Sequence, residues 1–388
     1  MLPLQGIRIV DLSNVVMGPY ATQLLAEYGA DVIKVEQPGG DDARRTGDAV
    51  EPDMASLFMG VNRGKRSFVL DLKQPSSRET LHRLVRSADV LVHNIRPQKL
   101  AKLGIAPDQM LAVNPMLVYA SLTGFGQTGP YGGRPAYDDV IQGMSGLAAF
   151  SHRHNGSRPF YQPTITADKT VGLVAVGAIL AALLKRERHG KGSVVEIPMF
   201  ESMVAFTLVE HMYGATFAKS DASMGYPRAL APWRKPFSTL DGFICVMPYT
   251  DKHWRELLLA TNHSDLAQDV RFTSIAARSE HTEFVYKTLA TILSTHTTAH
   301  WLHLLAQLEV PAAAINEPEA LLDDPHLKAV DFFHYTDDPK MGKLRFPGVP
   351  VLFDGVRPRV AAPPRLGEHN EEILREISLS EPTTTAAT

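Results

Sequence analysis

Hydrophobic positions in the first part of the chain change repeatedly between a strand period and a helix period. Residues 6–13 are typical of a strand, 18–29 of a helix with Pro in its first turn and Gly at its end, and 30–41 of a second strand that leads into a turn. A helix and a strand follow at 79–97, and a strand at 114–126 runs into a glycine-rich loop. This order predicts an α/β fold with a doubly wound parallel sheet, whose ligands bind beyond the carboxyl ends of the strands.

The second half of the chain has a different pattern of strands and helices. We predict a strand that runs into a helix at 192–206, a hairpin at 237–248, helices from about 252 to 309 and a closing helix at 363–377. Asp241-Gly242 is the turn signal of the hairpin. Residues 380–388 have the composition of a frayed tail.

Composition limits the class of protein. A length of 388 residues suggests about two domains, and 44% hydrophobic with 21% charged residues is typical of a soluble globular protein. A formal charge of -3 argues against a nucleic-acid or membrane partner, and no secretory signal is visible, so we expect a cytoplasmic protein. The most apolar segment, 171–184, is shorter than the roughly 20 residues of a membrane span, which favours a core helix.

Cysteine and histidine offer little site chemistry. Cys245 is the only cysteine, which excludes an internal disulfide and a thiolate metal cluster, and we expect it to be buried. His152 and His154 stand in a polar segment, expected to be a loop, with no third ligand nearby. We therefore expect no metal site.

The nucleotide signals in the first half are incomplete. Glu36, at the end of the second strand, stands where a ribose-binding acid would, but the first turn reads SNVVMGPY instead of G-x-G-x-x-G, which argues against a nicotinamide-dependent enzyme. The glycine-rich segment 124–135 lacks the Lys-Ser/Thr pair of a P-loop and is either a surface turn or a backbone that closes over a ligand. Basic residues recur on the loops, either as a solvated face or as a site for an anion: Arg44, Arg45, Arg63, Lys65, Arg66, Lys73, Arg96, Lys99 and Lys102.

Asp168 immediately precedes the long apolar run. An acidic residue at this place is typical of a helix N-cap, and on this stretch alone capping is the favoured interpretation. A catalytic carboxylate is the alternative.

Five segments, in this order, resemble the family III CoA-transferases of the CaiB/BaiF type, the group that includes formyl-CoA transferase, carnitine CoA-transferase and α-methylacyl-CoA racemase. They are residues 6–38, 62–73, 88–105, 119–147 and 190–203. The resemblance covers most of the first 205 residues and implies that 1–205 form the first part of a large Rossmann-like domain that binds CoA. It further implies a linker at 206–225, a smaller α+β domain at 226–325, a second linker and return to the large domain at 326–388, and an interlocked homodimer.

The resemblance also implies a set of site residues. It places the nucleophile on Asp168 and CoA binding on Val16, Met17, Leu70, Asp71, Leu72, Lys73, Asn94, Ile95, Arg96, Lys102, Arg134, Pro135, Ala136 and Tyr137. Lys73, Arg96 and Lys102 can neutralise phosphates. Asp138 stands where the transferases have an acidic residue near the nucleophile, and a loop aspartate that bonds its own backbone is the equal alternative.

The implied activity is transfer of CoA from an acyl-CoA thioester to a free carboxylic acid through an aspartyl anhydride and an aspartyl-CoA thioester, with CoA as substrate and no permanently bound cofactor. The racemases of the family carry histidine at the position of Tyr137, so an acyl-CoA racemase is the alternative, as is a CoA-binding protein without turnover. Residues 226–242 do not resemble the glycine-rich lid of formyl-CoA transferase, so we do not expect oxalate with formyl-CoA. We expect substrate acids of a few carbons, with dicarboxylic acids as one option. Arg228 and Arg234 are expected either to bind the distal carboxylate of such an acid or to be solvated.

Overall fold

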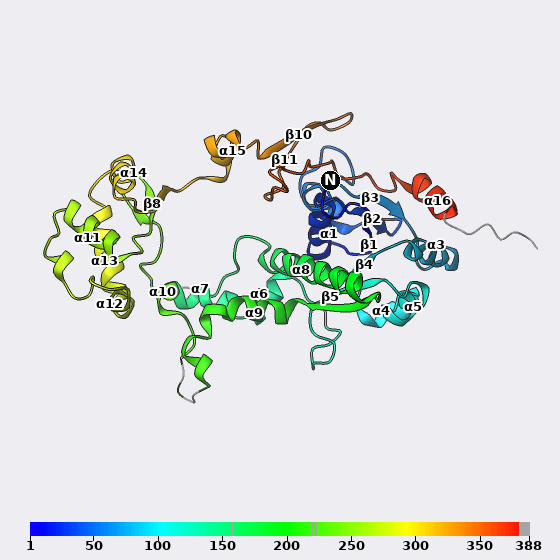
Figure 1. Ribbon diagram of the computed structural model, residues 1–388, viewed down its shortest axis with the longest axis horizontal. Coiled ribbons are helices and arrows are strands. Elements are labelled where there is room, and N and C mark those ends of the chain that lie inside the picture. The colour runs from blue at the N-terminus through cyan, green and yellow to red at the C-terminus, as the bar shows by residue number, and fades with distance from the viewer. Residues whose placement is uncertain (157, 219–220, 222, 380–388) are drawn as a thin grey trace, which may run out of the picture. The chain divides into compact units, whose positions relative to one another are not determined.

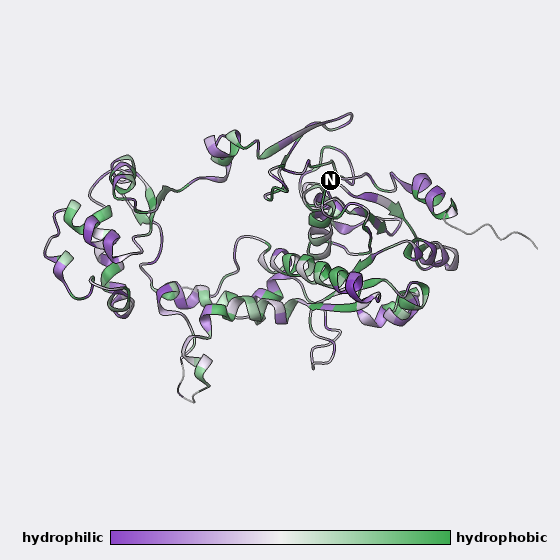
Figure 2. Cartoon of the chain, viewed as in Figure 1, coloured by the Kyte–Doolittle hydropathy of each residue, from purple (hydrophilic) through white to green (hydrophobic). Residues whose placement is uncertain are grey.

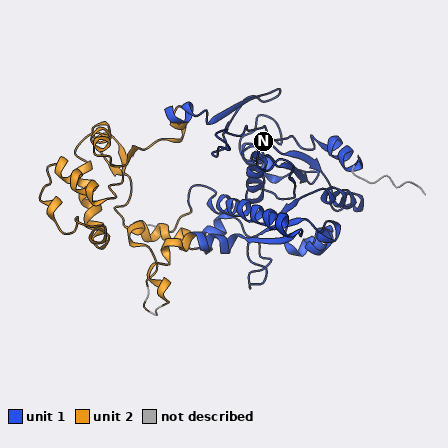
Figure 3. Ribbon diagram, viewed as in Figure 1, with its two compact units in different colours: residues 1–145, 162–206, 325–388 blue, residues 146–161, 207–324 orange. Residues whose placement is uncertain are grey.

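The computed structural model describes residues 1–156, 158–218, 221 and 223–379, which form two compact units (Figure 3). The first unit contains residues 1–145, 162–206 and the chain from 325 onward, and the second contains 146–161 and 207–324. The second unit thus takes in 146–161, which lie inside the range expected for the large domain.

The first unit is built on a six-stranded sheet in which every pair of neighbouring strands is parallel, as predicted (Figure 1). The strand order is β3-β2-β1-β4-β5-β6, so the direction of winding reverses between β1 and β4. A crevice at such a reversal is the usual ligand site of a doubly wound sheet. The strands are β1 Arg8–Asp11, β2 Asp31–Glu36, β3 Arg66–Val69, β4 Val90–His93, β5 Val118–Thr123 and β6 Ser193–Pro198.

Helices cover both faces of this sheet. Consecutive strand residues point to opposite faces, and the consecutive residues Ile9 and Val10 are both fully buried. On one face, Val10, Ile33 and Tyr119 pack with apolar side chains of α3, α4, α5 and α16. On the other, α1 contacts β1, β2 and β4, and α8 contacts β5 and β6. The helices of the unit are α1 Met17–Glu27, α2 Ser56–Val61, α3 Pro75–Arg86, α4 Pro97–Leu103, α5 Pro107–Val113, α6 Asp138–Met144, α8 Thr166–His189, α9 Met199–His211 (which runs on into the second unit), α15 Pro325–Ala329 and α16 Asn370–Leu379.

Helix α8 extends well beyond the apolar segment 171–184 and has 24 residues (Figure 2). Within the described part of the chain it is the one helix that is long and apolar enough to cross a membrane. This is weak evidence for a membrane span, because core helices of soluble proteins meet the same criterion. It packs closely against α1: a Cβ added at Gly172 would lie 3.0 Å from the Met17 carbonyl oxygen and 3.0 Å from the Tyr20 ring. The contact between the two helices therefore depends on a residue without a side chain.

The C-terminal part of the chain is tied to the sheet by charge. Arg66 of β3 pairs with Asp31 of β2 and with Glu372 and Glu376 of α16. The closing helix begins at Asn370, later than predicted, because Gly367 has a φ of 70°, in the left-handed region, and keeps the residues before Asn370 out of the helix. A hairpin, β10 Phe333–Asp338 with β11 Gly342–Pro347, precedes it. The tail predicted at 380–388 lies outside the described residues.

The second unit combines a small sheet with helices. The predicted hairpin is confirmed: β7 Phe237–Ser238 pairs antiparallel with β8 Phe243–Val246, and β9 Ala312–Ala314 adds a third strand. The predicted helical region also forms, with the core on Trp254, Leu289 and Trp301. The helices are α7 Leu147–Asn155, α10 Pro227–Leu230, α11 Asp251–Ala260, α12 Ile275–Glu280, α13 Thr282–Leu293 and α14 Thr298–Gln307.

Two expectations for this unit are wrong. Cys245 is exposed, because the alternation of β8 turns Ile244 and Val246 into the core and Cys245 to the opposite face. His152 and His154 lie on helix α7 and not in a loop.

Replacement of Gly172 by Val is expected to lower the free energy of unfolding by roughly 1–3 kcal/mol, because the new side chain would force α8 away from α1. Thermal and denaturant unfolding measure the effect. Gly60→Ala on α2 is the matched control, since a Cβ there meets open space, and it should leave stability unchanged or raise it slightly. Equal stability of Gly172→Val and the wild-type protein would contradict the close helix contact.

Candidate active site

A cavity of about 600 Å³ opens at the carboxyl ends of the parallel strands of the first unit. The loops that follow β1, β2, β3, β4 and β5 all contribute to its lining, and Asp168 of α8 and Met199 of α9 complete it. The cavity therefore spans the reversal between β1 and β4, where the connectivity of the sheet predicts a ligand site.

Most of the predicted site residues meet in this cavity. Its lining includes Asp168 together with Val16, Met17, Leu70, Asp71, Leu72, Lys73, Asn94, Ile95, Arg96, Arg134, Pro135, Ala136 and Tyr137. Two predicted residues do not line it. Lys102 is exposed on α4, next to the lining residue Leu103, and Asp138 accepts a hydrogen bond from the backbone N–H of Asp168.

Four cations line the cavity: Lys73, Arg96, Lys99 and Arg134. None of them has an ion pair with another residue of the described chain, and Arg134 lies over the Tyr131 ring. Lys99 was predicted only as one of the basic loop residues, without a CoA-binding role, and the polar lining residue Gln37 was not predicted. The signal for Lys99 is its spacing, because it follows Arg96 by three residues at the start of a helix and therefore lies on the same face.

The other basic residues of the early loops have structural partners. Arg44 binds Glu36, Arg63 binds Glu27 and Lys65 binds Asp11, all with buried side chains. Glu36 also accepts hydrogen bonds from Ser67 Oγ and the Asp41 N–H. Both oxygens of Glu36 are therefore engaged within the protein, which contradicts a role in binding a ribose.

The start of α1 contributes to the lining of the cavity. Val16 and Met17 line the cavity, and the helix begins at Met17 without a side-chain cap. Gly18 is required here because a Cβ would lie 2.3 Å from the side chain of Ser13. The absence of a side chain at Gly18 therefore allows α1 to pack closely against Ser13. Free N–H groups at a helix N-terminus favour an anion.

Asp168 is not the helix cap that the stretch alone favours. Helix α8 begins at Thr166, so Asp168 is already inside the first turn, and Ile165 in the capping position makes no side-chain bond. The Asp168 carboxylate, half-buried, accepts no hydrogen bond from the described residues. Its backbone N–H donates to Asp138 Oδ1 at 3.0 Å, and Gln142 Nε2 donates to Asp138 Oδ2 at 2.5 Å. Asp138 thus fixes the start of α8, and the Asp168 carboxylate stays open to the cavity.

The electrostatic environment of Asp168 favours a proton. Burial raises the pKa of Asp168, and the negative charge of Asp138 raises it further, to about 7. A carboxylate that is partly buried and has no hydrogen-bond donor among the described residues is in the conditions that increase its reactivity as a nucleophile.

The glycine-rich loop after β5 is anchored at two backbone groups. Gly126 N–H donates to Glu201 at 2.9 Å, and Gln127 N–H donates to Glu196 at 2.8 Å. A Cβ at Gly124 would lie 2.5 Å from the Cβ of Ala136, so this glycine allows the loop to fold back on the segment that leads to Tyr137. Tyr137 itself is 69% exposed.

The second unit holds a separate small cavity of about 100 Å³, lined by Arg228 with Tyr226 and Tyr286 among others. Arg228 donates to the Tyr286 hydroxyl at 3.2 Å, and Arg234 is exposed. Among the residues that the structure describes, no group of three His, Cys, Asp or Glu side chains is arranged for a metal ion.

Comparison with known proteins agrees with this architecture. The model of CoA-transferase family III matches residues 4–370. The chain is 34% identical to the succinate–glutarate CoA-transferase of Agrobacterium fabrum, over 99% of this chain and 98% of that protein, and 30% identical to the human succinyl-CoA:glutarate CoA-transferase, over 97% and 86%. The crystal structure of Rv3272 from Mycobacterium tuberculosis superposes with a TM-score of 0.83 at 31% identity, covering 95% of this chain and 98% of that one. The chain belongs to CoA-transferase family III.

Proposed function

We propose that this CoA-transferase moves CoA from an acyl-CoA to a free carboxylic acid through covalent intermediates on Asp168. One observation carries the proposal: among the described residues, the Asp168 carboxylate accepts no hydrogen bond and lines a cavity with four cations that make no ion pair. CoA is a large polyanion joined to a neutral thioester. Cations for its phosphates and a reactive carboxylate for its thioester are therefore found in one cavity.

Four steps complete the transfer. The Asp168 carboxylate attacks the acyl carbonyl and expels CoA thiolate, which leaves a mixed anhydride, and the thiolate then attacks the aspartyl carbonyl and releases the donor acid. The acceptor carboxylate attacks the aspartyl-CoA thioester and expels the thiolate again. The thiolate finally attacks the acceptor's acyl carbonyl, which yields the new acyl-CoA and restores Asp168.

Each attack builds negative charge on a carbonyl oxygen, and that charge requires donors placed in advance. The backbone around Gly124 and the first turn of α1 lie in the same lining as Asp168 and are the groups we assign to this role. We assign the CoA phosphates to Lys73, Arg96, Lys99 and Arg134, and the adenine to apolar strand ends that include Leu70 and Leu72.

We propose short dicarboxylic acids as the acceptor and donor acids. Relatives over nearly the full length of the chain are named as transferases of succinate and glutarate.

Replacement of Asp168 by Asn should abolish transfer, with a loss of at least 10³-fold in kcat, because an amide cannot form the anhydride. The assay follows new thioesters by mass in mixtures of acyl-CoAs with mono- and dicarboxylic acids. Transfer that survives in Asp168→Asn would contradict the nucleophile, and deuterium exchange at the α-carbon without acyl exchange would instead show a racemase.

The pH profile tests the environment of Asp168. Since only the deprotonated carboxylate attacks, kcat/KM should rise with pH and level off above the pKa of about 7. Asp138→Asn removes the neighbouring charge, so the pKa of Asp168 falls and the rise moves to lower pH, while an acceptor for the Asp168 N–H is retained. A profile that does not move, or moves to higher pH, would contradict the assigned cause.

We also propose a homodimer that covers the exposed apolar face of the first unit. We define this face by Leu173, Val174 and Leu184 of α8 and Val194 of the edge strand β6, which are 55%, 44%, 52% and 51% exposed. Exposed apolar side chains gathered on one helix and an unpaired sheet edge are typical of a subunit interface.

Light scattering should give the mass of a dimer for the wild-type protein and of a monomer for the double variant Leu173→Glu, Leu184→Glu, because two charges would be buried without partners. Val50→Glu, at a loop residue 78% exposed, is the control and should remain dimeric. A monomeric wild-type protein, or a double variant that stays dimeric, would rule out this interface.

A further inference from the structure

The turn between β1 and α1 contains a residue in an unfavourable backbone conformation. Val15 has a φ of 70°, in the left-handed region, where a β-branched side chain is a rare outlier. Turns that bind pyrophosphate in related sheets use glycine where the backbone needs unusual freedom. Val15 lines the cavity next to Val16 and Met17, so its conformation sets the entry into α1.

Asp41 supplies the contact that holds this conformation. Both of its carboxylate oxygens accept the Val15 N–H, at 3.0 and 3.2 Å, and Oδ1 also accepts the Ala43 N–H. The side chain of Asn94 clamps the neighbouring peptide, since Oδ1 accepts the Asn14 N–H at 3.0 Å and Nδ2 donates to the Asn14 carbonyl at 2.8 Å. The turn is therefore held from two sides by side chains of other loops.

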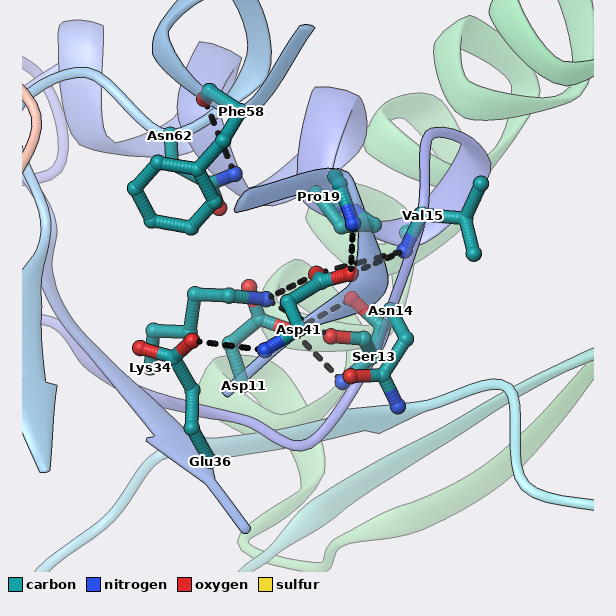
Figure 4. A network of polar contacts seen from close by, with 12 residues as sticks. Asp11, Ser13, Asn14, Val15, Pro19, Lys34, Glu36, Asp41, Phe58 and Asn62 are labelled. Carbon is teal, nitrogen blue, oxygen red and sulfur yellow. Dashed lines mark hydrogen bonds and ion pairs between the residues drawn. The ribbon is translucent and has the colours of Figure 1, made fainter. Parts of the chain in front are cut away.

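The Asp41 carboxylate is buried, and Lys34 neutralises it (Figure 4). Lys34 Nζ lies 2.9 Å from Asp41 and donates to the Ser13 carbonyl at 2.8 Å, so one ammonium binds both the carboxylate and the turn. Burial alone would lower the pKa of Lys34, but the surrounding carboxylates outweigh it and raise that pKa. Lys34 therefore keeps its positive charge, which offsets the charge of Asp41 beneath the turn.

We infer that Asp41, paired with Lys34, is a positioning residue for CoA binding: its carboxylate holds Val15 in the left-handed conformation and thereby orients the first turn of α1 toward the cavity. The inference rests on the proposed function, in which this turn contacts CoA. Asp41 acts through the backbone of Val15 and touches neither the reacting atoms nor Asp168.

The principal test variant is Asp41→Leu combined with Lys34→Met, which removes the acceptor and leaves no unpaired buried charge. We expect acyl-CoA to show a KM raised about tenfold and CoA a Kd raised to match, with kcat within threefold of wild type. Addition of Val15→Gly, which adopts a positive φ without strain, should recover most of the lost affinity. Asp41→Asn with Lys34 intact keeps one acceptor and should lie between wild type and the principal variant.

The matched control removes the buried ion pair of Arg63 and Glu27, which touches no residue of the turn, through Glu27→Leu and Arg63→Met. This control should lose stability without the rise in KM, and Val15→Gly should bring it no gain. The inference would be overturned if Val15→Gly did not restore CoA affinity to the principal variant. It would also be overturned if Val15→Gly raised CoA affinity equally in the control.

Crystal structures of the variants give a readout that does not depend on CoA. We expect Val15 to leave the left-handed region in the principal variant and to keep it in the Glu27 control. If the wild-type protein binds no CoA, the proposed function fails, and the φ of Val15 still decides the inference. A positive φ that persists without Asp41 would overturn it.

Discussion

The structure of the cavity depends on a balance of charges buried beneath it. Three acidic and three basic buried side chains are paired as Asp11 with Lys65, Asp41 with Lys34 and Glu36 with Arg44, and Asp11 and Glu36 are the last residues of β1 and β2. Lys34 and Lys65 raise the charged fraction of Asp11 and lower its pKa to about 2, although burial alone would raise it. Loss of one partner would leave a buried charge at a cost of about 3–5 kcal/mol. Because the pairs are complete, backbone groups of the turns above them can bind an anion.

The sequence predicts the parallel sheet and the region of the cavity well, because both follow from local patterns. Strand β4 is a short buried apolar run over Val90, Leu91 and Val92, and residues that follow parallel strands must meet at one edge of the sheet. The resemblance to the family adds the individual positions, and all but Lys102 and Asp138 line the cavity. Strand β3 is not distinguished by its pattern, since its four residues begin with Arg66 and follow directly on Lys65.

What the sequence does not show is the partner of each charge. In the sequence, Arg44 and Lys65 cannot be distinguished from solvated loop residues. The fold pairs Arg44 with Glu36 and Lys65 with Asp11. From the sequence pattern, Asp168 is expected to cap a helix, because the pattern does not locate the start of α8 to within two residues. A shift of two residues decides whether this carboxylate caps the helix or stays free. Val15 gives no signal at all, since a valine in the left-handed region needs a distant acceptor, Asp41, to hold it.

The central claim is that Asp168 carries the CoA during transfer. Its carboxylate is close to Asp138, accepts no hydrogen bond from the part of the chain that the structure describes, and lies in a cavity lined by cations. The most direct measurement is to mix the protein with an acyl-CoA in the absence of an acceptor acid, trap with hydroxylamine and map the modified peptide by mass spectrometry. The account predicts a hydroxamate at residue 168 that depends on the acyl-CoA. A protein that turns over yet is modified at another residue, or nowhere, would contradict it.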